Sequence, residues 1–302
     1  MMDKSTFEVI IIGGSYAGLS AAMALGRSLR KVLIIDSGKP CNRQTPHAHN
    51  FITQDGKTPK EISALALSQV LQYDGVQLFN GLAVSGNKTD NGFEITTQSG
   101  EKFSGKKLLF ATGITDLFPA ITGFAECWGI SILHCPYCHG YEVRQEHIGL
   151  LGNGDMRFEL SKLLSNWSDK LTLFTNGAST LTAEQTVKLD SHHIQIVEKE
   201  ISAFEHDNGS VKQILFKDST TTPIAAVFAR VPFAQHCTIP QALGCEITEQ
   251  GYIKVDDFSK TTVPGIYAAG DNSTMMRALP AAVAAGTKAG AMMNRELIEE
   301  EF

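Results

Sequence analysis

The feature that most constrains the fold is a glycine-rich turn that joins a buried strand to a helix near the N-terminus. Residues 8–12 form a short β-branched run typical of a parallel sheet, and the helical stretch 16–29 follows the turn. A second such run, residues 31–35, ends in Asp36. This order predicts a βαβ unit. Its turn is close to the dinucleotide fingerprint G-x-G-x-x-G, with Ser15 at the middle glycine position.

Each glycine of such a turn has its own physical task. The first permits the tight turn, the middle one lets the backbone approach a pyrophosphate, and the last lets the helix pack closely on the strand. Gly13 and Gly18 meet the first and the last requirement, while Ser15 adds only one small Cβ. Asp36 stands where a carboxylate can accept the hydroxyls of an adenosine ribose. The turn therefore predicts a dinucleotide site.

A second βαβ unit is predicted in the middle of the chain. It has a strand at residues 148–151, a turn at 152–157, a helix at 158–166 and a strand at 171–174. Two nucleotide-type units in one chain of 302 residues indicate two α/β domains of ordinary size.

The second turn departs from the fingerprint. Gly152, Gly154 and Asp155 make it a candidate nicotinamide site, but Arg157 stands where Gly or Ala permits close helix packing. The segment after the next strand, residues 175–179, carries neither arginines for a 2′-phosphate nor a carboxylate for a ribose. Two readings of this domain therefore stay open. It binds NADH or NADPH for catalysis, or it is a vestigial nucleotide-binding domain that is retained to carry the cysteines.

Other segments predict further elements. Thr58 and Glu61 form a capping box that starts a helix ending near residue 73. A strand is expected at residues 252–255, and a helix at 279–299 with Pro280 in its first turn.

Cys135 and Cys138 stand two residues apart, and His139 follows them. In a redox dithiol one thiolate attacks a substrate disulphide and the second thiol resolves the mixed disulphide, so both sulfurs must lie within bonding reach. With an ordinary pKa of about 6.5, a histidine can take or return a thiol proton near neutral pH, which makes His139 the candidate acid and base.

Three other uses of the cysteine pair remain open. A zinc site would need more ligands than His134 and His139 can supply so close in sequence, and no metal is expected. Haem attachment would imply export, and the N-terminus carries no recognisable leader. Two plain buried cysteines are the third reading.

The composition excludes some classes of partner. Lys and Arg number 26 against 32 Asp and Glu, for a formal charge of −6, and no basic block is interleaved with aromatic residues. No apolar run approaches the roughly 18 residues of a membrane span. We therefore expect a globular protein that binds neither nucleic acid nor membrane. The N-terminal sequence without a leader pattern and the scattered cysteines predict a cytoplasmic location.

These motifs occur in a recognisable order: a Gly-Gly-x-x-Ala-Gly turn, Ala111-Thr112-Gly113, the C-x-x-C pair, a second glycine turn and Ala-Ala-Gly-Asp at 268–271. This layout resembles that of the low-molecular-weight thioredoxin reductases, which are FAD-dependent disulphide oxidoreductases. The resemblance implies an FAD domain at residues 1–116 and 226–302, an inserted pyridine-nucleotide-type domain at 117–225 that carries the cysteines, and a homodimer. The candidate FAD-binding residues are Gly13, Gly14, Ser15, Ala17, Gly18, Asp36, Arg43, Ala111, Thr112, Gly113, Gly270, Asp271 and Ala278.

The resemblance also implies roles for the cysteines. Cys138 would face the flavin and Cys135 would be the outer nucleophile, serving a thioredoxin-like protein or a small dithiol or disulphide. The stretch 135–142, CPYCHGYE, looks closer to a branch of the family that includes dithiol oxidases, whose electrons run to dioxygen. A ferredoxin-linked reductase and a non-catalytic flavoprotein redox sensor also remain open. His49, on the loop after Asp36, is a further residue that could touch FAD.

Overall fold

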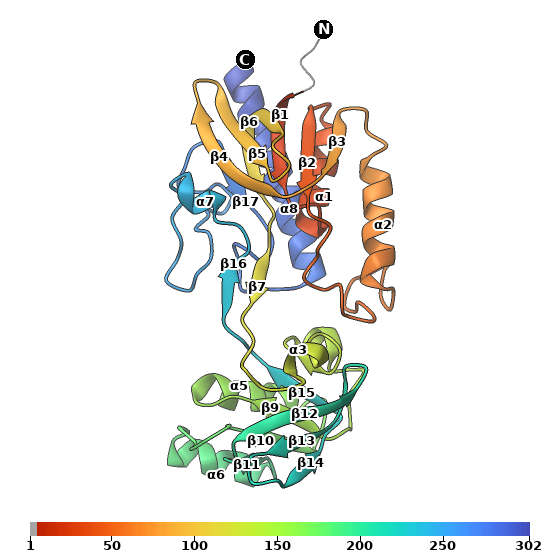
Figure 1. The fold of residues 1–302 in the computed structure, drawn as a ribbon, viewed down its shortest axis with the longest axis vertical. Coiled ribbons are helices and arrows are strands. Elements are labelled where there is room, and N and C mark those ends of the chain that lie inside the picture. Colours follow the sequence, from red (N-terminus) through yellow and green to blue (C-terminus); the bar gives the residue numbers. More distant parts are fainter. Residues whose placement is uncertain (1–4) are drawn as a thin grey trace. The chain divides into compact units, whose positions relative to one another are not determined.

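The computed structural model describes residues 5–302, which divide into two compact units (Figure 1). The first unit comprises the described residues through Arg43, together with Phe51–Thr115 and Phe233–Phe302. The second unit comprises Gln44–Asn50 and Asp116–Pro232. The chain returns to the first unit at residue 233 rather than at 226, because strand β15 (Ala226–Ala229) pairs with two strands of the second unit.

A seven-stranded sheet forms the centre of the first unit, in the order β3-β2-β1-β6-β5-β4, with β17 also paired to β6. The strands β1, β2, β3, β6 and β17 run parallel, while β4, β5 and β6 form an antiparallel meander. Neighbouring residues Ile10 and Ile11 pack in different apolar clusters, so both faces are buried, as the continuous apolar run predicts. The bounds are β1 Thr6–Ile12, β2 Val32–Asp36, β3 Val76–Asn80, β4 Ala83–Thr89, β5 Gly92–Thr97, β6 Lys102–Phe110 and β17 Ile266–Ala268.

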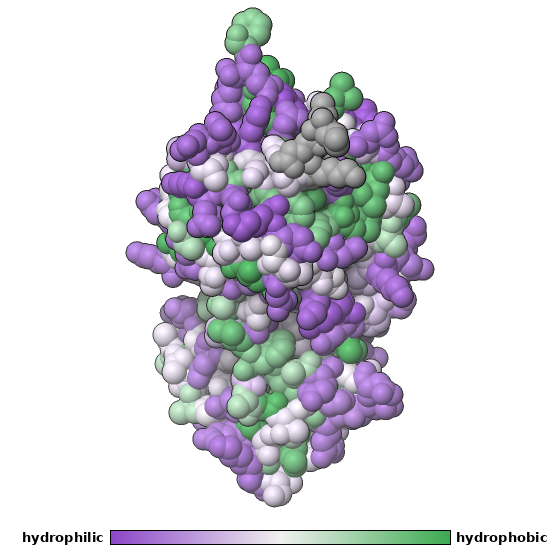
Figure 2. Space-filling view, turned by 45° about the horizontal axis from the view of Figure 1, so that its top comes forward, coloured by the Kyte–Doolittle hydropathy of each residue, from purple (hydrophilic) through white to green (hydrophobic). Residues whose placement is uncertain are grey.

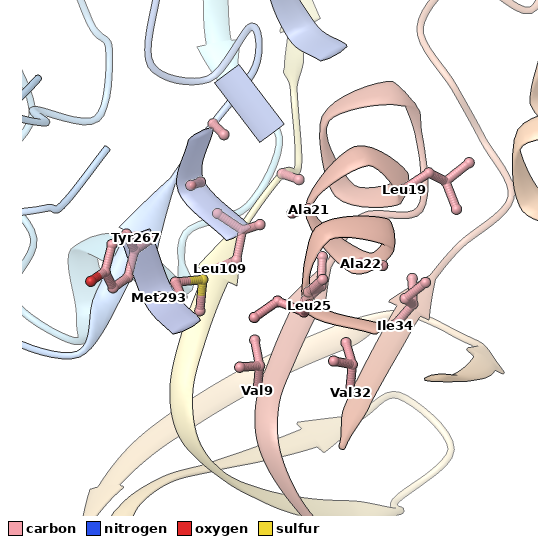
Figure 3. Packing of buried hydrophobic residues seen from close by; sticks show 14 of the residues in the cluster. Val9, Leu19, Ala21, Ala22, Leu25, Val32, Ile34, Leu109, Tyr267 and Met293 are labelled. Carbon is pink, nitrogen blue, oxygen red and sulfur yellow. The ribbon is translucent and has the colours of Figure 1, made fainter. Parts of the chain in front are cut away.

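Two helices, α1 (Tyr16–Arg27) and α8 (Leu279–Glu301), pack against each other over this sheet (Figure 3). A Cβ added at Gly286 would meet the carbonyl oxygen of Ala17 at 2.0 Å, so glycine is what lets the two backbones approach. Helix α2 (Pro59–Val70) begins at the predicted capping box, and α7 (Ile239–Ala242) packs near β4.

A charged network fastens α8 to the sheet. The ammonium group of Lys107, a buried residue on β6, lies 2.6 Å from a carboxylate oxygen of Glu296 and also pairs with Glu300. Tyr267 donates a hydrogen bond to Glu296 at 2.5 Å, and Lys260 lies 2.5 Å from the same carboxylate. Burial alone would raise the pKa of Glu296, yet hydrogen bonds from these three donors lower it to about 2.

The second unit is built on a five-stranded parallel sheet in the order β11-β10-β9-β15-β8. A three-stranded antiparallel sheet, β12-β13-β14, accompanies it. The bounds are α3 Phe124–Cys127, β8 Ile132–Leu133, α4 Pro136–His139, β9 Ile148–Leu151, α5 Asp155–Leu164, β10 Leu171–Phe174, α6 Ala183–Ser191, β11 Gln195–Val197, β12 Ile201–Asp207, β13 Ser210–Phe216 and β14 Thr221–Pro223. Two Rossmann-like α/β domains are thereby confirmed.

Short segments complete the fold. Strands β7 (Ile114–Asp116) and β16 (Phe233–Gln235) form a two-stranded ribbon. The prediction of a strand at residues 252–255 was wrong, because this segment pairs only through isolated bridges at Ile253 and Val255. None of the helices within residues 5–302 has the length and apolar character that crossing a bilayer requires.

Candidate functional site

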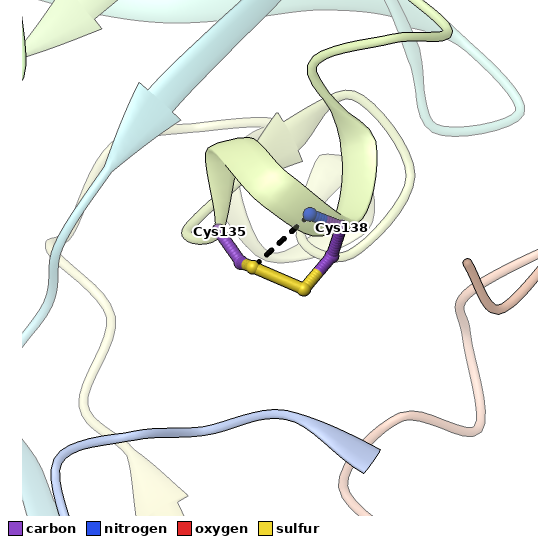
Figure 4. The surroundings of a disulfide bond; sticks show 2 residues. All are labelled: Cys135 and Cys138. Atoms are coloured by element: carbon purple, nitrogen blue, oxygen red, sulfur yellow. Dashed lines mark hydrogen bonds between the residues drawn. A yellow bond between two sulfur atoms is a disulfide. The ribbon is translucent and has the colours of Figure 1, made fainter. Parts of the chain in front are cut away.

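Cys135 and Cys138 are joined in a disulphide at the start of α4, in the second unit (Figure 4). Their Cα atoms lie 5.3 Å apart, within the span that a disulphide requires. Cys135 is the N-cap residue, and its Sγ accepts a hydrogen bond from the backbone N–H of Cys138 at 3.2 Å. Pro136 suits the first helical turn, where its missing N–H costs no hydrogen bond. The two-residue spacing thus holds both sulfurs in one tight turn.

His139 is the last residue of α4 and lies half-buried. Burial, and then the nearby charge of His49, lower the pKa of His139 to about 4. The imidazole is therefore neutral near pH 7, with one ring nitrogen able to accept a proton. His49 Nε2 lies 3.6 Å from Glu142 Oε1, so a second histidine and a carboxylate stand beside this candidate base.

Sequence reasoning missed this grouping. From the sequence, His49 was a loop residue that could touch FAD or lie in solvent; the structure assigns its segment, Gln44–Asn50, to the second unit. No local pattern links His49 to residues so far along the chain. Glu142 offered a weak signal, because it follows His139 within the same short stretch. His134, by contrast, stacks on Trp128 with ring centroids 6.0 Å apart.

Aromatic side chains support the cysteine turn. The ring of Tyr137 meets Trp167 edge to face, with centroids 5.6 Å apart. A Cβ at Gly140 would lie 3.0 Å from the Trp167 indole and 2.6 Å from the carbonyl oxygen of Pro136, so this position requires glycine. Tyr137 and Tyr141 remain exposed, which leaves an aromatic surface beside the disulphide.

In the first unit, three strand ends meet at one edge of the sheet. Phe110 on β6 is the register neighbour of both Ile12 on β1 and Ala268 on β17. All three strands are parallel, so the segments that follow them leave the sheet side by side, at the edge where α/β folds bind their ligands. Those segments hold most of the candidate FAD residues: Gly13, Gly14, Ser15, Ala17 and Gly18 after β1, Ala111, Thr112 and Gly113 after β6, and Gly270 and Asp271 after β17.

The turn after β1 has no room for larger side chains. A Cβ at Gly13 would meet the carbonyl oxygen of Ala111 at 2.3 Å, and one at Gly18 would meet that of Gly13 at 1.9 Å. The N-cap of α1, Ser15, makes no side-chain hydrogen bond, and the first turn of the helix has no acidic residue. This helix start therefore offers unneutralised N–H groups to a pyrophosphate.

Asp36 anchors the turn. One carboxylate oxygen accepts the N–H of Gly14 at 2.8 Å, and the other accepts the N–H of Gly38 at 3.0 Å. Each oxygen keeps a lone pair for a ribose hydroxyl. The donor and acceptor set of this edge therefore fits FAD.

Asn272 is a buried residue at this edge that sequence reasoning missed. Its side-chain N–H donates to the carbonyl oxygen of Phe110 at 2.8 Å and lies 3.4 Å from Thr112 Oγ1. Its Oδ1 is buried and has no hydrogen-bond partner among residues 5–302. A buried acceptor without a partner is costly, and its place beside the FAD candidates suits a ligand that donates to it.

Two other candidate FAD-binding residues, Arg43 and Ala278, lie outside the segments that directly follow these three strands. Arg43 is exposed and donates to the carbonyl oxygen of Pro40 at 3.2 Å. Ala278 is the N-cap of α8, and the preceding Arg277 lies 3.6 Å from Asp271.

The second glycine turn lies between β9 and α5. Gly152 and Gly154 both have positive φ, which glycine adopts without strain, and Asp155 is the first residue of the helix. Gln185 on α6 donates to the Asp155 carboxylate at 2.8 Å. Arg157 is buried rather than solvent-facing. Within the described part of the chain, His, Cys, Asp and Glu side chains form no cluster of three or more that could hold a metal ion.

A glycine turn in each of two Rossmann-like units, together with a vicinal cysteine pair, defines a disulphide oxidoreductase. A family model described as pyridine nucleotide-disulphide oxidoreductase matches residues 7–286. Thioredoxin reductase tcpT of Claviceps purpurea (strain 20.1) is 33% identical over 99% of this chain and 97% of that protein. The solved structure of a putative thioredoxin reductase TrxB from Bacillus anthracis is similar, with a TM-score of 0.93 and 30% identity over 98% of this chain and 100% of that one. An oxidoreductase from Agrobacterium tumefaciens is similar as well, with a TM-score of 0.91 and 33% identity over 97% of this chain and 99% of that one.

The chain belongs to the pyridine nucleotide-disulphide oxidoreductase family. It is a thioredoxin reductase-like enzyme, an FAD-dependent thiol–disulphide oxidoreductase.

Proposed function

We propose that Cys135 and Cys138 are the redox pair of this enzyme, and that His139 manages their protons. The observation that carries the proposal is the disulphide between the two residues in the first turn of α4, which His139 ends. The lowered pKa of His139, about 4, keeps its imidazole neutral near pH 7 but makes it a weaker base than an ordinary histidine. The external partner is a thioredoxin-like protein or a small molecule that carries a disulphide or a dithiol.

Reduction of an external disulphide by the reduced pair is a balanced exchange. The Cys135 thiolate attacks one external sulfur, the external S–S bond breaks, and one external thiolate leaves and takes a proton. The Cys138 thiolate then attacks Cys135 Sγ, which forms the internal disulphide and releases the second external thiol. His139 accepts the proton of the attacking thiol and returns it to the leaving thiolate. Two electrons and two protons pass to the substrate, and the reverse sequence oxidises a dithiol.

We also propose that FAD binds at the edge formed by the turns after β1, β6 and β17. Support comes from the bare helix start at Ser15, the ribose-ready carboxylate of Asp36 and the buried Oδ1 of Asn272. When bound, FAD supplies the two-electron store with which the cysteine pair exchanges electrons.

We further propose that the enzyme is a homodimer in a reducing cytoplasm, on the likeness to its family and on the scattered cysteines. Sedimentation equilibrium tests the homodimer, and cell fractionation tests the location.

Anaerobic titration of the purified yellow protein with dithiothreitol tests the cysteine assignment. We expect the flavin band of the wild type to bleach, and Cys138→Ser to lose at least about a thousandfold in bleaching rate because the resolving sulfur is gone. Cys41→Ser, which removes an exposed thiol outside the pair, should bleach like the wild type. Equal bleaching of Cys138→Ser and the wild type would contradict the assignment.

A further inference from the structure

The family implies a pyridine nucleotide at the second glycine turn, but the residues of that turn do not fit one. Gly18 and Arg157 hold the same position in the two fingerprints. In the first unit no side chain fits there, since a Cβ at Gly18 would lie 1.9 Å from a carbonyl oxygen. In the second unit a whole arginine side chain is present, with only 7% of its surface exposed.

The Arg157 side chain lies over the turn itself. A Cβ at Gly152 would be 2.2 Å from Arg157 Nε and 3.0 Å from its Cδ, so the arginine occupies the space toward which Gly152 opens. The middle of its guanidinium is 3.1 Å from the same point. In a nucleotide-binding turn, the space beside the first glycine holds no side-chain atoms. The free space lets the backbone approach the pyrophosphate and lets the helix pack closely on the strand.

Arg157 also crosses the place where a dinucleotide would rest. Its Nη2 donates to the carbonyl oxygen of Arg230, just beyond β15, at 3.0 Å. The chain runs from β9 to β10 and β11 on one side of the sheet and returns to β15 on the other, so the strand order reverses between β9 and β15. Doubly wound sheets bind ligands in the crevice at this reversal, and here the arginine spans it.

Asn153 closes the other end of the turn. Its Oδ1 accepts hydrogen bonds from the N–H groups of Gly154 at 3.0 Å and Thr180 at 2.8 Å, and from the Thr180 hydroxyl at 3.0 Å. Its side-chain N–H donates to the carbonyl oxygen of Ala178 at 2.8 Å. The turn is thus fastened to the loop that would receive the adenosine ribose, and one of its N–H donors is already used.

Charge at this loop opposes an anionic ligand. Glu198 accepts the N–H of Ser179 at 2.7 Å, which places a carboxylate on the loop that would face a 2′-phosphate. Residues 175–182 contain no lysine or arginine to offset it.

We propose that Arg157 and Asn153 close the second turn against NADH and NADPH, so that this enzyme works without a nicotinamide at that site. The inference rests on the proposed function for its consequence: the reductant that reaches the Cys135–Cys138 disulphide is a dithiol, which leaves as a disulphide as the cysteine pair becomes two thiols. Atoms and electrons balance within that exchange.

Calorimetric titration of the flavin-loaded protein with NADH and NADPH, each to roughly 2 mM, tests the proposal by equilibrium binding. We expect no saturable binding of either nucleotide. The Arg157→Gly variant should gain at least about tenfold in NADH affinity, because it removes the side chain that spans the crevice. Arg144→Gly is the matched control, since it removes an exposed arginine whose guanidinium lies over the ring of Tyr141 outside this turn; it should gain nothing.

Saturable binding of either nucleotide to the wild type would overturn the proposal. Unchanged affinity in a folded, yellow Arg157→Gly protein would overturn the role of Arg157. Anaerobic titration of the same wild-type sample with dithiothreitol reports separately on the proposed function, because bleaching by dithiothreitol depends on the cysteine pair and not on the second turn.

Discussion

The depressed pKa of His139 predicts a specific loss of stability in mild acid. The pKa of this side chain falls from an ordinary 6.5 to about 4, because burial and then His49 disfavour its charged form. Between these two pH values the unfolded chain binds a proton that the native protein does not, so the free energy of unfolding falls as the pH falls. For these two pKa values, the loss on going from pH 7.5 to pH 5 is about 2 kcal/mol.

Replacing the histidine removes this contribution. In His139→Gln no imidazole titrates, so the loss of unfolding free energy between the two pH values should be smaller than in the wild type by about 2 kcal/mol. Urea unfolding of the flavin-loaded protein at both pH values measures it. His192→Gln, which changes an exposed histidine at the end of α6, is the control and should follow the wild type. If His139→Gln also follows the wild type, the neutral buried state of His139 is refuted.

His49 supplies the second, smaller cause, and its removal separates the two. In His49→Gln the pKa of His139 should rise above about 4 but stay below 6.5, because burial is the larger cause and is unchanged. Proton NMR titration of the His139 ring measures the value directly. A pKa that does not move would show that the His49 charge does not reach His139.

Two further predictions concern the first unit. Lys107→Met should lower the free energy of unfolding at neutral pH by about 2 kcal/mol, because Glu296 loses its buried cationic partner and keeps only Lys260 and Tyr267. Lys106→Met, which breaks an exposed pair on the same strand, should cost under about 1 kcal/mol in the same urea titration. Gly18→Ala should yield protein without the yellow flavin absorbance, because its Cβ would meet the carbonyl oxygen of Gly13 at 1.9 Å, and a variant that purifies fully loaded would contradict the tight turn.

Much of the fold was predictable because local signals and packing agree. The runs at residues 8–12 and 31–35 became β1 and β2, since a continuous apolar run is stable only with both faces buried. The C-terminal helix begins at Leu279 as expected, with Pro280 in its first turn. Helix α6 was missed although its signal was present: Thr182 and Gln185 form a capping box.

The cysteine turn and the glycine turn after β1 were predictable for a different reason. Both sites consist of residues close in sequence, so spacing alone fixes which atoms meet: Cys135 and Cys138 share one helical turn, and Gly13 and Gly18 share one strand-to-helix corner. The histidine environment was not predictable, because burial and the arrival of His49 from another segment decide it. Local spacing carries no information about either.

Arg157 was predictable only in part: its identity can be read from the sequence, but the direction of its side chain cannot. The sequence shows that an arginine replaces glycine, and this alone allows two outcomes: the side chain can point to solvent and leave the turn open, or it can fold inward. Folding inward buries a cation, and the desolvation this entails lowers the pKa of Arg157. That cost is offset in part by the hydrogen bond to the Arg230 carbonyl. A nucleotide would have to displace the guanidinium from this partner before its phosphates reached the turn. The inward side chain is therefore a stronger reason to expect exclusion of the nucleotide than the missing glycine is.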